Sequence, residues 1–407
     1  MPPIAETKRL AALGEPDFRW FLASRFCSAT AMTGLRTAIA WHVFALTGSP
    51  FALGLLGAVQ FAPALGLSLV GGAFADAHDR RRIAQVTQAI AVAGAALLAA
   101  ASVLGGASAP LLFAVVFVVA LAAAFENPAR AALLPLVVSR ERFVAAVPVH
   151  STAQAFALMS GPALAGVAIG AAGVAAAYAG IAALSLGAIA GLGRIRPRHP
   201  DGERRQVSLR AIREGVAYVR GQPVLLGCMT LDMFAVIFAG ASALLPVYAQ
   251  EILRVGPWGF GVLSASLEAG ALAMSVLLMV RRPIRGQGRA LLAAVAVFGL
   301  ATIAFGLSRS FWLSVAIYVL VGMADQVSVV MRSTIVQLTT PDELRGRVSS
   351  INMIFIGASN QVGAMESGFV AALTSATFSV VSGGVASLAV AALVAARVPA
   401  LRRYRAG

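Results

Sequence analysis

The sequence has little charge and almost no cysteine. Charged residues make up 12% of the 407 residues, about half the share in a soluble domain, whereas 59% are hydrophobic and the mean hydropathy is +0.84. This composition excludes a water-soluble globular protein, and the high hydrophobicity also excludes a disordered chain. The two cysteines, Cys27 and Cys228, lie in apolar runs, which excludes a disulfide scaffold and a cysteine metal site. The class that remains is a polytopic membrane protein.

Motifs typical of ATP use and of hydrolytic chemistry are also absent from the sequence. It contains no Walker-type phosphate-binding loop, so we do not expect ATP to be the energy source. It contains neither an H-E-x-x-H metal motif nor a nucleophile elbow with its partner residues. We therefore expect no enzyme, no metal site and no cofactor.

Apolar segments long enough to cross a bilayer recur along the whole chain. A spanning helix needs about 20 apolar residues, and glycine and proline separate the segments from one another. The expected spans are residues 19–46, 51–75, 83–106, 110–134, 144–171, 174–193, 223–250, 258–280, 289–308, 312–337, 346–373 and 377–397. Twelve spans place both termini on the same side of the membrane.

Arginine accounts for most of the net charge of +15 and clusters in alternate connections between the apolar segments. One set of connections carries many arginines, including Arg80, Arg140, Arg281 and Arg345, whereas the other set contains only Arg254 and Arg309. By the positive-inside rule, the arginine-rich loops and both termini are cytoplasmic. We therefore expect a monomer in the bacterial inner membrane, surrounded by membrane lipid and with no nucleic-acid partner.

The two halves of the chain repeat each other at an offset of 202 residues. At this offset the following residues match: Arg130 with Arg332, Leu136 with Leu338, Glu141 with Glu343, Gly161 with Gly363 and Gly166 with Gly368. The repeat predicts an all-α membrane protein with twelve transmembrane helices in two parallel six-helix repeats, and substrate bound between them near the midplane.

The expected domains are six-helix bundles at residues 1–193 and 223–407, joined by a cytoplasmic linker at 194–222. The second part of the linker has Val216, Val219 and two further apolar residues at helical spacing, with arginines on the other face. This pattern predicts an amphipathic helix that lies on the inner leaflet.

The first cytoplasmic connection resembles the loop signature of the major facilitator superfamily, G-x-x-x-D-R-x-G-R-R/K, although Ala77 and Asp79 depart from it. The resemblance implies the major facilitator fold and a cytoplasmic gate in which Asp76 is held by a basic partner. We place the following residues in this gate: Gly72, Asp76, Arg80, Glu126 and Arg130. We expect Glu126 to pair with Arg130. The alternative is an ordinary positive-inside loop.

Two further motifs point to one branch of this superfamily. Gly161, Pro162 and Gly166 resemble the core of its antiporter motif, G-P-x-x-G-G, with simple close packing of helices as the alternative. The runs NPARAALLPLV and TTPDELRGRVSSINMIF resemble the drug–proton antiporter branch that includes macrolide and enterobactin (siderophore) exporters. This resemblance implies export driven by proton entry.

Three carboxylates of the second half lie inside expected spans. Asp232 and Glu268 fall near the midplane of their spans and Asp325 slightly past it, so the three could lie close together. An ionisable group at this depth is unfavourable by roughly 2.5–3.5 kcal/mol and normally faces a cavity. Because apolar surroundings and neighbouring carboxylates favour protonation, such groups can carry a proton. We rank Asp232 first, then Asp325 and Glu268; structural hydrogen bonding is the alternative.

The expected substrate cavity combines aromatic and polar residues with two charged groups. Its residues are Arg36, Gln154, Phe156, Phe234, Phe238, Asn352, Phe355, Asn360, Gln361 and Glu366. Arg36 and Glu366 are expected to form an ion pair, or Arg36 to bind an anionic group of the cargo. Such a lining suits an amphipathic organic molecule, so we predict its proton-coupled export. The alternatives are an uncoupled or uptake carrier, a lipid flippase, and a transport-inactive sensor or scaffold.

Overall fold

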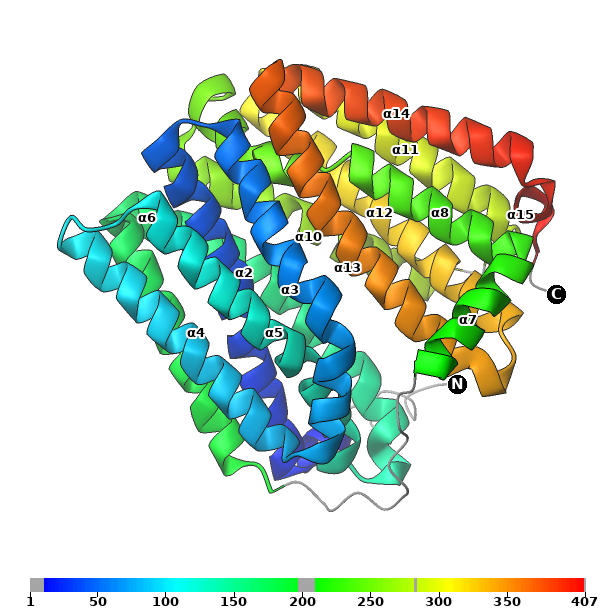
Figure 1. Ribbon diagram of the computed structural model, residues 1–407, viewed down its shortest axis with the longest axis horizontal. Coiled ribbons are helices and arrows are strands. Elements are labelled where there is room, and N and C mark those ends of the chain that lie inside the picture. Colours follow the sequence, from blue (N-terminus) through cyan, green and yellow to red (C-terminus); the bar gives the residue numbers. More distant parts are fainter. Residues whose placement is uncertain (1–10, 197–208, 282–283, 406–407) are drawn as a thin grey trace. The chain divides into compact units, whose positions relative to one another are not determined.

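Helices form almost the whole of the described chain. The computed structural model describes residues 11–196, 209–281 and 284–405, and the backbone alone of 11, 64–73, 75–77, 140, 209–213, 215 and 350 (Figure 1). The long helices are α2 (Pro16–Thr47), α3 (Pro50–Ala77), α4 (Arg80–Val103), α5 (Ala109–Val137), α6 (Arg140–Arg194), α10 (Gly256–Val280), α11 (Gln287–Leu307), α12 (Phe311–Thr339), α13 (Asp342–Leu373) and α14 (Ala376–Arg397). The shorter ones are η1 (Ala11–Gly14), α7 (Leu209–Gly221), α8 (Pro223–Phe238), η2 (Ala241–Leu244), α9 (Leu245–Val247), the π-helical η3 (Tyr248–Ile252) and α15 (Pro399–Arg403).

Each predicted span coincides with helical structure. Among the described residues, eight helical segments are long and apolar enough to cross a membrane, one of them the interrupted segment Pro223–Ile252. Another is α6, which contains two predicted spans joined at Gly173, where φ is 81° and ψ is 174°. Glycine adopts this left-handed region without strain, which explains why the break between the spans falls there. The remaining three predicted spans coincide with α2, α3 and α13.

The predicted span 223–250 is not one continuous helix. The α-helical hydrogen bonds of α8 end with Ala239 donating to Ala235, and η2, α9 and η3 continue the chain. A Cβ atom on Gly240 would lie 2.9 Å from the Gly363 carbonyl oxygen, and one on Gly383 would overlap the Phe238 carbonyl oxygen. The break therefore lies where α13 and α14 approach the end of α8 most closely.

The contacts divide the chain into two compact units. Unit 1 comprises residues 1–42 and 66–206, and unit 2 comprises residues 43–65 and 207–407. The first half of α3 thus groups with unit 2, where Phe51 stacks on Phe369 of α13 at a centroid distance of 4.8 Å. The domain boundaries expected from the sequence, 1–193 and 223–407, remain a prediction.

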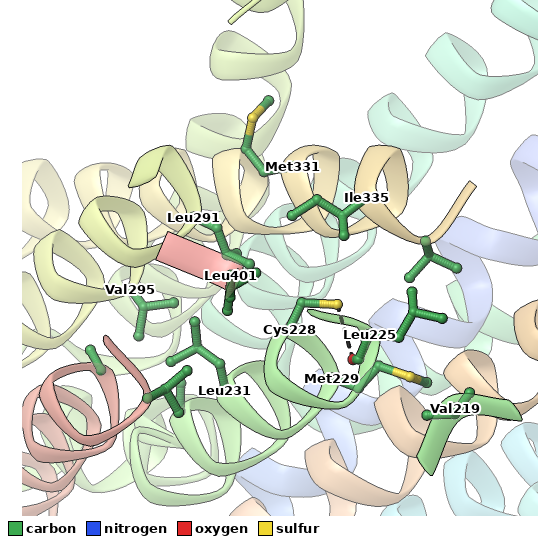
Figure 2. Close-up of a cluster of buried hydrophobic side chains, with 14 of the residues drawn as sticks. Val219, Leu225, Cys228, Met229, Leu231, Leu291, Val295, Met331, Ile335 and Leu401 are labelled. Atoms are coloured by element: carbon green, nitrogen blue, oxygen red, sulfur yellow. Dashed lines mark hydrogen bonds between the residues drawn. The ribbon is translucent and has the colours of Figure 1, made fainter. Parts of the chain in front are cut away.

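The core of unit 2 joins helices that are distant in the sequence. Leu225, Cys228 and Leu231 of α8 pack with Leu291 of α11 and Leu401 of α15 (Figure 2). All five side chains are fully buried. In Figure 1, α14 and α11 lie beside α8, in agreement with their contacts. This core fixes the half of α8 that carries Asp232.

The predicted amphipathic helix is present as α7, and the described part of its apolar face packs against protein. Val219 belongs to the core of unit 2 and Val216 packs against it. The Tyr218 hydroxyl donates to the Thr339 carbonyl oxygen at 2.9 Å, and Glu214 pairs with Arg347 of α13. At these positions α7 is docked on unit 2, because the helices beside it offer a buried apolar surface. The side chains of Leu209 and Ile212 lie outside the described part.

Matched glycines repeat one helix crossing in both units. In unit 1, a Cβ atom on Gly161 of α6 would overlap the Thr33 hydroxyl of α2 and lie 2.8 Å from the Gly34 nitrogen. In unit 2, a Cβ atom on Gly363 of α13 would lie 2.7 Å from the Val236 carbonyl oxygen of α8. Because these two glycines are 202 residues apart, the sequence repeat corresponds to a repeated packing contact.

Candidate functional site

Buried charges within the spans form separate groups, one in unit 1 and two in unit 2. In unit 1, Arg130 Nε donates to Glu126 Oε1 at 2.5 Å, one helical turn away on α5. The same oxygen accepts from Gln88 Nε2 at 2.7 Å and from the Ser28 hydroxyl at 3.1 Å. Arg130 Nη1 also donates to the Ser24 hydroxyl at 3.3 Å. The predicted Glu126–Arg130 pair is therefore present, inside a network that links α2, α4 and α5.

The loop before α4 shows why Asp79 replaces the glycine of the superfamily signature. Its side chain accepts from the backbone nitrogens of Arg81, at 2.9 Å, and Arg82, at 3.4 Å, and so caps the N-terminus of α4. Arg80 Nη1 donates to the Ala132 carbonyl oxygen of α5 at 3.3 Å. These contacts hold the end of α4 against α5. Only the backbone is described at Gly72 and Asp76, so their gate contacts remain a prediction.

In unit 2, Asp232 of α8 forms an ion pair with Arg332 of α12. Both side chains are buried, with exposed fractions of 7% and 3%. An isolated charge at such a position would be strongly unfavourable, so each group depends on the other. The sequence analysis identified Asp232 but not its partner. The signal was the repeat, because Arg332 occupies the position that matches the buried Arg130.

Glu268 of α10 and Asp325 of α12 form the second charged group of unit 2. Each carboxylate lies within the electrostatic reach of the other and of the buried Tyr318. Within the described part of the chain, neither carboxylate has a cationic partner. Two acidic side chains on neighbouring helices thus lie within electrostatic reach of each other in a membrane-spanning region, and neither forms an ion pair among the described residues.

Two glycines explain how α10 and α12 bring these carboxylates together. A Cβ atom on Gly322 of α12 would overlap the carbonyl oxygen of Leu267, the residue before Glu268. A Cβ atom on Gly270 of α10 would likewise overlap the carbonyl oxygen of Val319. The two backbones are therefore in direct contact on both sides of Glu268 and one turn before Asp325, which only residues without side chains permit.

The structure separates the three predicted carboxylates into two sites. Arg332 follows Asp325 by seven residues, which corresponds to about 10 Å of helical rise along α12. Asp232 is bound to Arg332, whereas Glu268 lies within electrostatic reach of Asp325. The three groups do not form one cluster, because the α8 carboxylate is held by a cation two turns away from the others.

The residues expected to line a cavity differ in exposure. Arg36 and Phe156 of unit 1 are exposed, as are Phe234 and Asn360 of unit 2. Phe234 stacks on Phe238 with a centroid distance of 6.2 Å. Phe355 instead packs against the core of unit 2, which favours a role in helix packing.

Several polar groups in the same set lack partners in the described part of the chain. Gln154 Oε1 and Asn352 Oδ1 are buried atoms without a hydrogen-bond partner there. Glu366 accepts a long hydrogen bond of 3.4 Å from Ser367, the next residue in α13. Arg36 belongs to unit 1 and Glu366 to unit 2, so the expected pair between them remains a prediction.

Tight packing, rather than a pocket, surrounds the motif at Gly161. Gly161, Pro162 and Gly166 are all buried within α6. The direct contact of Gly161 with α2 favours the packing interpretation of this motif. Gln361 of α13 lies at a close contact with α3 within unit 2. A Cβ atom on Gly57 of α3 would lie 2.8 Å from the Gln361 carbonyl oxygen.

Comparison with known families shows the family to which the chain belongs. The family model of the transmembrane secretion effectors matches residues 7–405. The chain belongs to this family of major facilitator transporters. It is 28% identical over 389 residues to the multidrug efflux pump Tap of Mycobacterium tuberculosis, which covers 90% of this chain and 89% of that protein. It is 23% identical over 331 residues to macrolide efflux protein A of Streptococcus pyogenes, covering 78% and 80%.

Solved structures confirm the predicted fold. A bacterial homolog of the human lysosomal transporter Spinster, inward-facing and occupied, superposes with a TM-score of 0.73 at 15% identity and covers 100% of both chains. The nucleoside transporter NupG superposes with a TM-score of 0.69 at 13% identity, covering 95% of this chain and 99% of its own. The transmembrane secretion effector is thus an all-α, multi-pass membrane protein of the major facilitator fold. It is a small-molecule transporter of an efflux family and not an enzyme.

Proposed function

We propose that this transporter exports an amphipathic organic compound in exchange for protons, by alternating access. The names of its relatives support export, since they describe multidrug and macrolide efflux. Exposed aromatic side chains at Phe156 and Phe234, together with polar groups such as Asn360, suit a cargo with both apolar and polar parts. Siderophore-like compounds remain within this cargo class.

The proposed proton pathway rests on Glu268 and Asp325, which have no cationic partner among the described residues. Two neighbouring carboxylates in apolar surroundings do not both ionise readily, so the pair titrates as a unit and can hold one proton. Uptake of this proton from the outside and its release to the cytoplasm would couple the cargo cycle to the proton gradient. We place these two residues ahead of Asp232 as proton carriers.

Asp232 is a second candidate for proton binding, but its protonation would require a change in its ion pair with Arg332. Its carboxylate is bound by Arg332 in a buried pair, which favours the ionised form. Protonation of Asp232 would leave Arg332 without its counter-charge, so it requires a rearrangement between α8 and α12. This arrangement supports a role in holding one conformation of the transporter, with proton binding as the less direct alternative.

Orientation follows from the arginine distribution. We propose an inner-membrane monomer with both termini in the cytoplasm, because the arginine-rich connections then face inward. Gly72, Asp76, Arg80, Glu126 and Arg130 would then form the cytoplasmic gate. The capped start of α4 and the buried network around Glu126 support a rigid scaffold for it.

Proton release from acid-loaded everted membrane vesicles tests the proposal. We expect a responding compound, from a panel of macrolides, dyes and catecholate siderophores, to dissipate the gradient with the wild type. Asp325→Asn and Glu268→Gln should abolish this response, whereas Glu343→Gln, which removes an exposed carboxylate, should retain it. If Asp232→Asn abolishes the response while the other two variants keep it, the assignment of the proton carriers is wrong.

Two other outcomes would favour the alternative functions. Directional cargo flux that no proton gradient affects would favour an uncoupled carrier, and phospholipid-dependent counterflow would favour a flippase. A transport-inactive sensor or scaffold would need the linker for a partner, so deletion of residues 199–207 should abolish its activity. A transporter should tolerate the same deletion.

A further inference from the structure

A basic cavity lies at one end of unit 2, away from the acidic pair. Its volume is about 500 Å³, and its lining consists of Arg289 at the start of α11 and of Arg402, Arg403, Tyr404 and Arg405 in and after α15. Four arginines and one tyrosine thus line one space. Residues of such different positions in the sequence meet because α15 folds back onto the beginning of α11.

The arginines of this cavity form no ion pair with a carboxylate among the described residues. The ion pairs of unit 2, within the described residues, use Arg332, Arg345 and Arg347. All four cavity arginines are exposed. Mutual repulsion of four unpaired cations is unfavourable, so the arrangement favours binding of an anion.

Packing holds the cavity walls in place. Leu401 is fully buried in the core of unit 2, among the side chains labelled in Figure 2. A Cβ atom on Gly288 would overlap the Leu401 carbonyl oxygen, so the backbones of α11 and α15 are in direct contact. The Thr339 hydroxyl donates to the Tyr404 hydroxyl at 3.3 Å, which ties the phenol to the end of α12. The cavity is therefore part of the folded unit.

The chemistry of the lining suits a phosphate group. Guanidinium groups bind phosphate oxygens through paired, charge-assisted hydrogen bonds, and a tyrosine hydroxyl can donate one more. A phosphate could come from a membrane lipid or from a soluble compound. Basic pockets at the cytoplasmic ends of transmembrane helices are well suited to anionic lipid headgroups.

The surrounding surface favours the lipid. The cavity lies where α11 begins and just beyond the end of α14, and both helices are long and apolar enough to span the membrane. The same helices expose apolar side chains, with exposed fractions of 58% at Leu300 and 54% at Leu393. Acyl chains could lie along this surface while the headgroup occupies the cavity, whereas a soluble phosphate would use the cavity alone.

We propose that this cavity binds the phosphate of an anionic phospholipid. Native mass spectrometry of the purified, full-length protein with phosphatidylglycerol or phosphatidylcholine tests it. The wild type should prefer phosphatidylglycerol, and the variant R402Q/R403Q/R405Q should bind it about 10- to 100-fold more weakly. The matched control R196Q/R220Q/R281Q removes the same charge from exposed arginines elsewhere and should bind like the wild type.

Two further measurements on the wild type distinguish a lipid headgroup from a soluble phosphate compound as the ligand. A photoactivatable phosphatidylglycerol should label wild-type peptides that contain Gln287–Arg289 or Pro399–Arg405, and inorganic pyrophosphate should compete only at millimolar concentration. Tight binding of pyrophosphate that excludes the lipid would instead indicate a soluble ligand and overturn the lipid assignment. Equal binding of both lipids by the wild type, or equal phosphatidylglycerol binding by the cavity variant and the control, would also overturn it.

Discussion

Arg332 binds the carboxylate of Asp232 on a neighbouring helix, whereas its counterpart in the repeat, Arg130, binds Glu126 on its own helix. At the offset of 202 residues, Ser328 matches Glu126 and Asp232 matches Thr30. The two units thus share the buried arginine, but the carboxylate that pairs with it lies on the same helix in unit 1 and on a neighbouring helix in unit 2. As a result, the pair in unit 2 connects α8 and α12, while the pair in unit 1 stabilises α5 itself.

This difference predicts the response of the Asp232–Arg332 pair to substitution. Arg332→Met leaves a buried carboxylate without a partner and should lower the stability of the protein by about 3–5 kcal/mol. The double substitution Asp232→Leu with Arg332→Met removes both charges and should recover most of that loss. Thermal unfolding of the purified protein in detergent would measure both effects.

Arg345→Met provides the control, because Arg345 forms an exposed pair with Asp342. It should change stability by no more than about 1 kcal/mol. A double variant as unstable as Arg332→Met alone would show that packing at this site, rather than charge balance, determines the loss.

The contact between α10 and α12 predicts a strong effect of a single methyl group. Gly322→Ala would place that group against the Leu267 carbonyl oxygen and force the helices apart, with a loss of about 1–3 kcal/mol. The same displacement would separate Glu268 from Asp325, so proton release in vesicles should fall as well.

Gly357→Ala is the matched control for this prediction, since nothing lies within 4 Å of a Cβ atom at that position of α13. Its melting temperature should equal or exceed that of the wild type, because alanine is the better helix former. Equal effects of the two substitutions would contradict the proposed backbone contact.

The cap at Asp79 predicts which substitutions the start of α4 tolerates. Asp79→Ala removes the acceptor of the Arg81 and Arg82 backbone nitrogens and should cost about 1 kcal/mol of stability. Asp79→Asn keeps an acceptor, and Asp79→Gly, which restores the residue of the superfamily signature, should cost only a few tenths of a kcal/mol. Chemical denaturation in mixed micelles would rank the three variants, and a ranking with glycine below alanine would argue against capping.

Much of the architecture could be predicted from sequence because bilayer thickness and hydrophobicity constrain it directly. The apolar segments located the spans, and the positive φ of Gly173 lies in the short gap between the expected spans 144–171 and 174–193. The offset of 202 residues likewise anticipated the matched crossings at Gly161 and Gly363.

The pairing of charges was harder to predict. Helical depth placed Asp232, Glu268 and Asp325 at similar levels, but it carries no information on which helix faces which. Only the packing of α8 and α10 against α12 shows that Asp232 meets Arg332 while Glu268 meets Asp325. The contacts of Val216 and Val219 with the core of unit 2 were not predicted for the same reason, since the sequence pattern does not distinguish a lipid surface from a protein surface.

The seventh predicted span, residues 223–250, is interrupted at Gly240, where its α-helical hydrogen bonding stops. The last α-helical hydrogen bond before it is donated by Ala239, and the next two bonds, from Ala241 to Ala239 and from Ala243 to Gly240, span fewer residues. The segment from Ala241 to Ile252 is therefore not joined to α8 by continuous α-helical hydrogen bonds, so the direction of α8 does not fix its direction. A movement of that segment would leave Asp232 seated on Arg332, so the two ends of one span can serve different steps of a transport cycle.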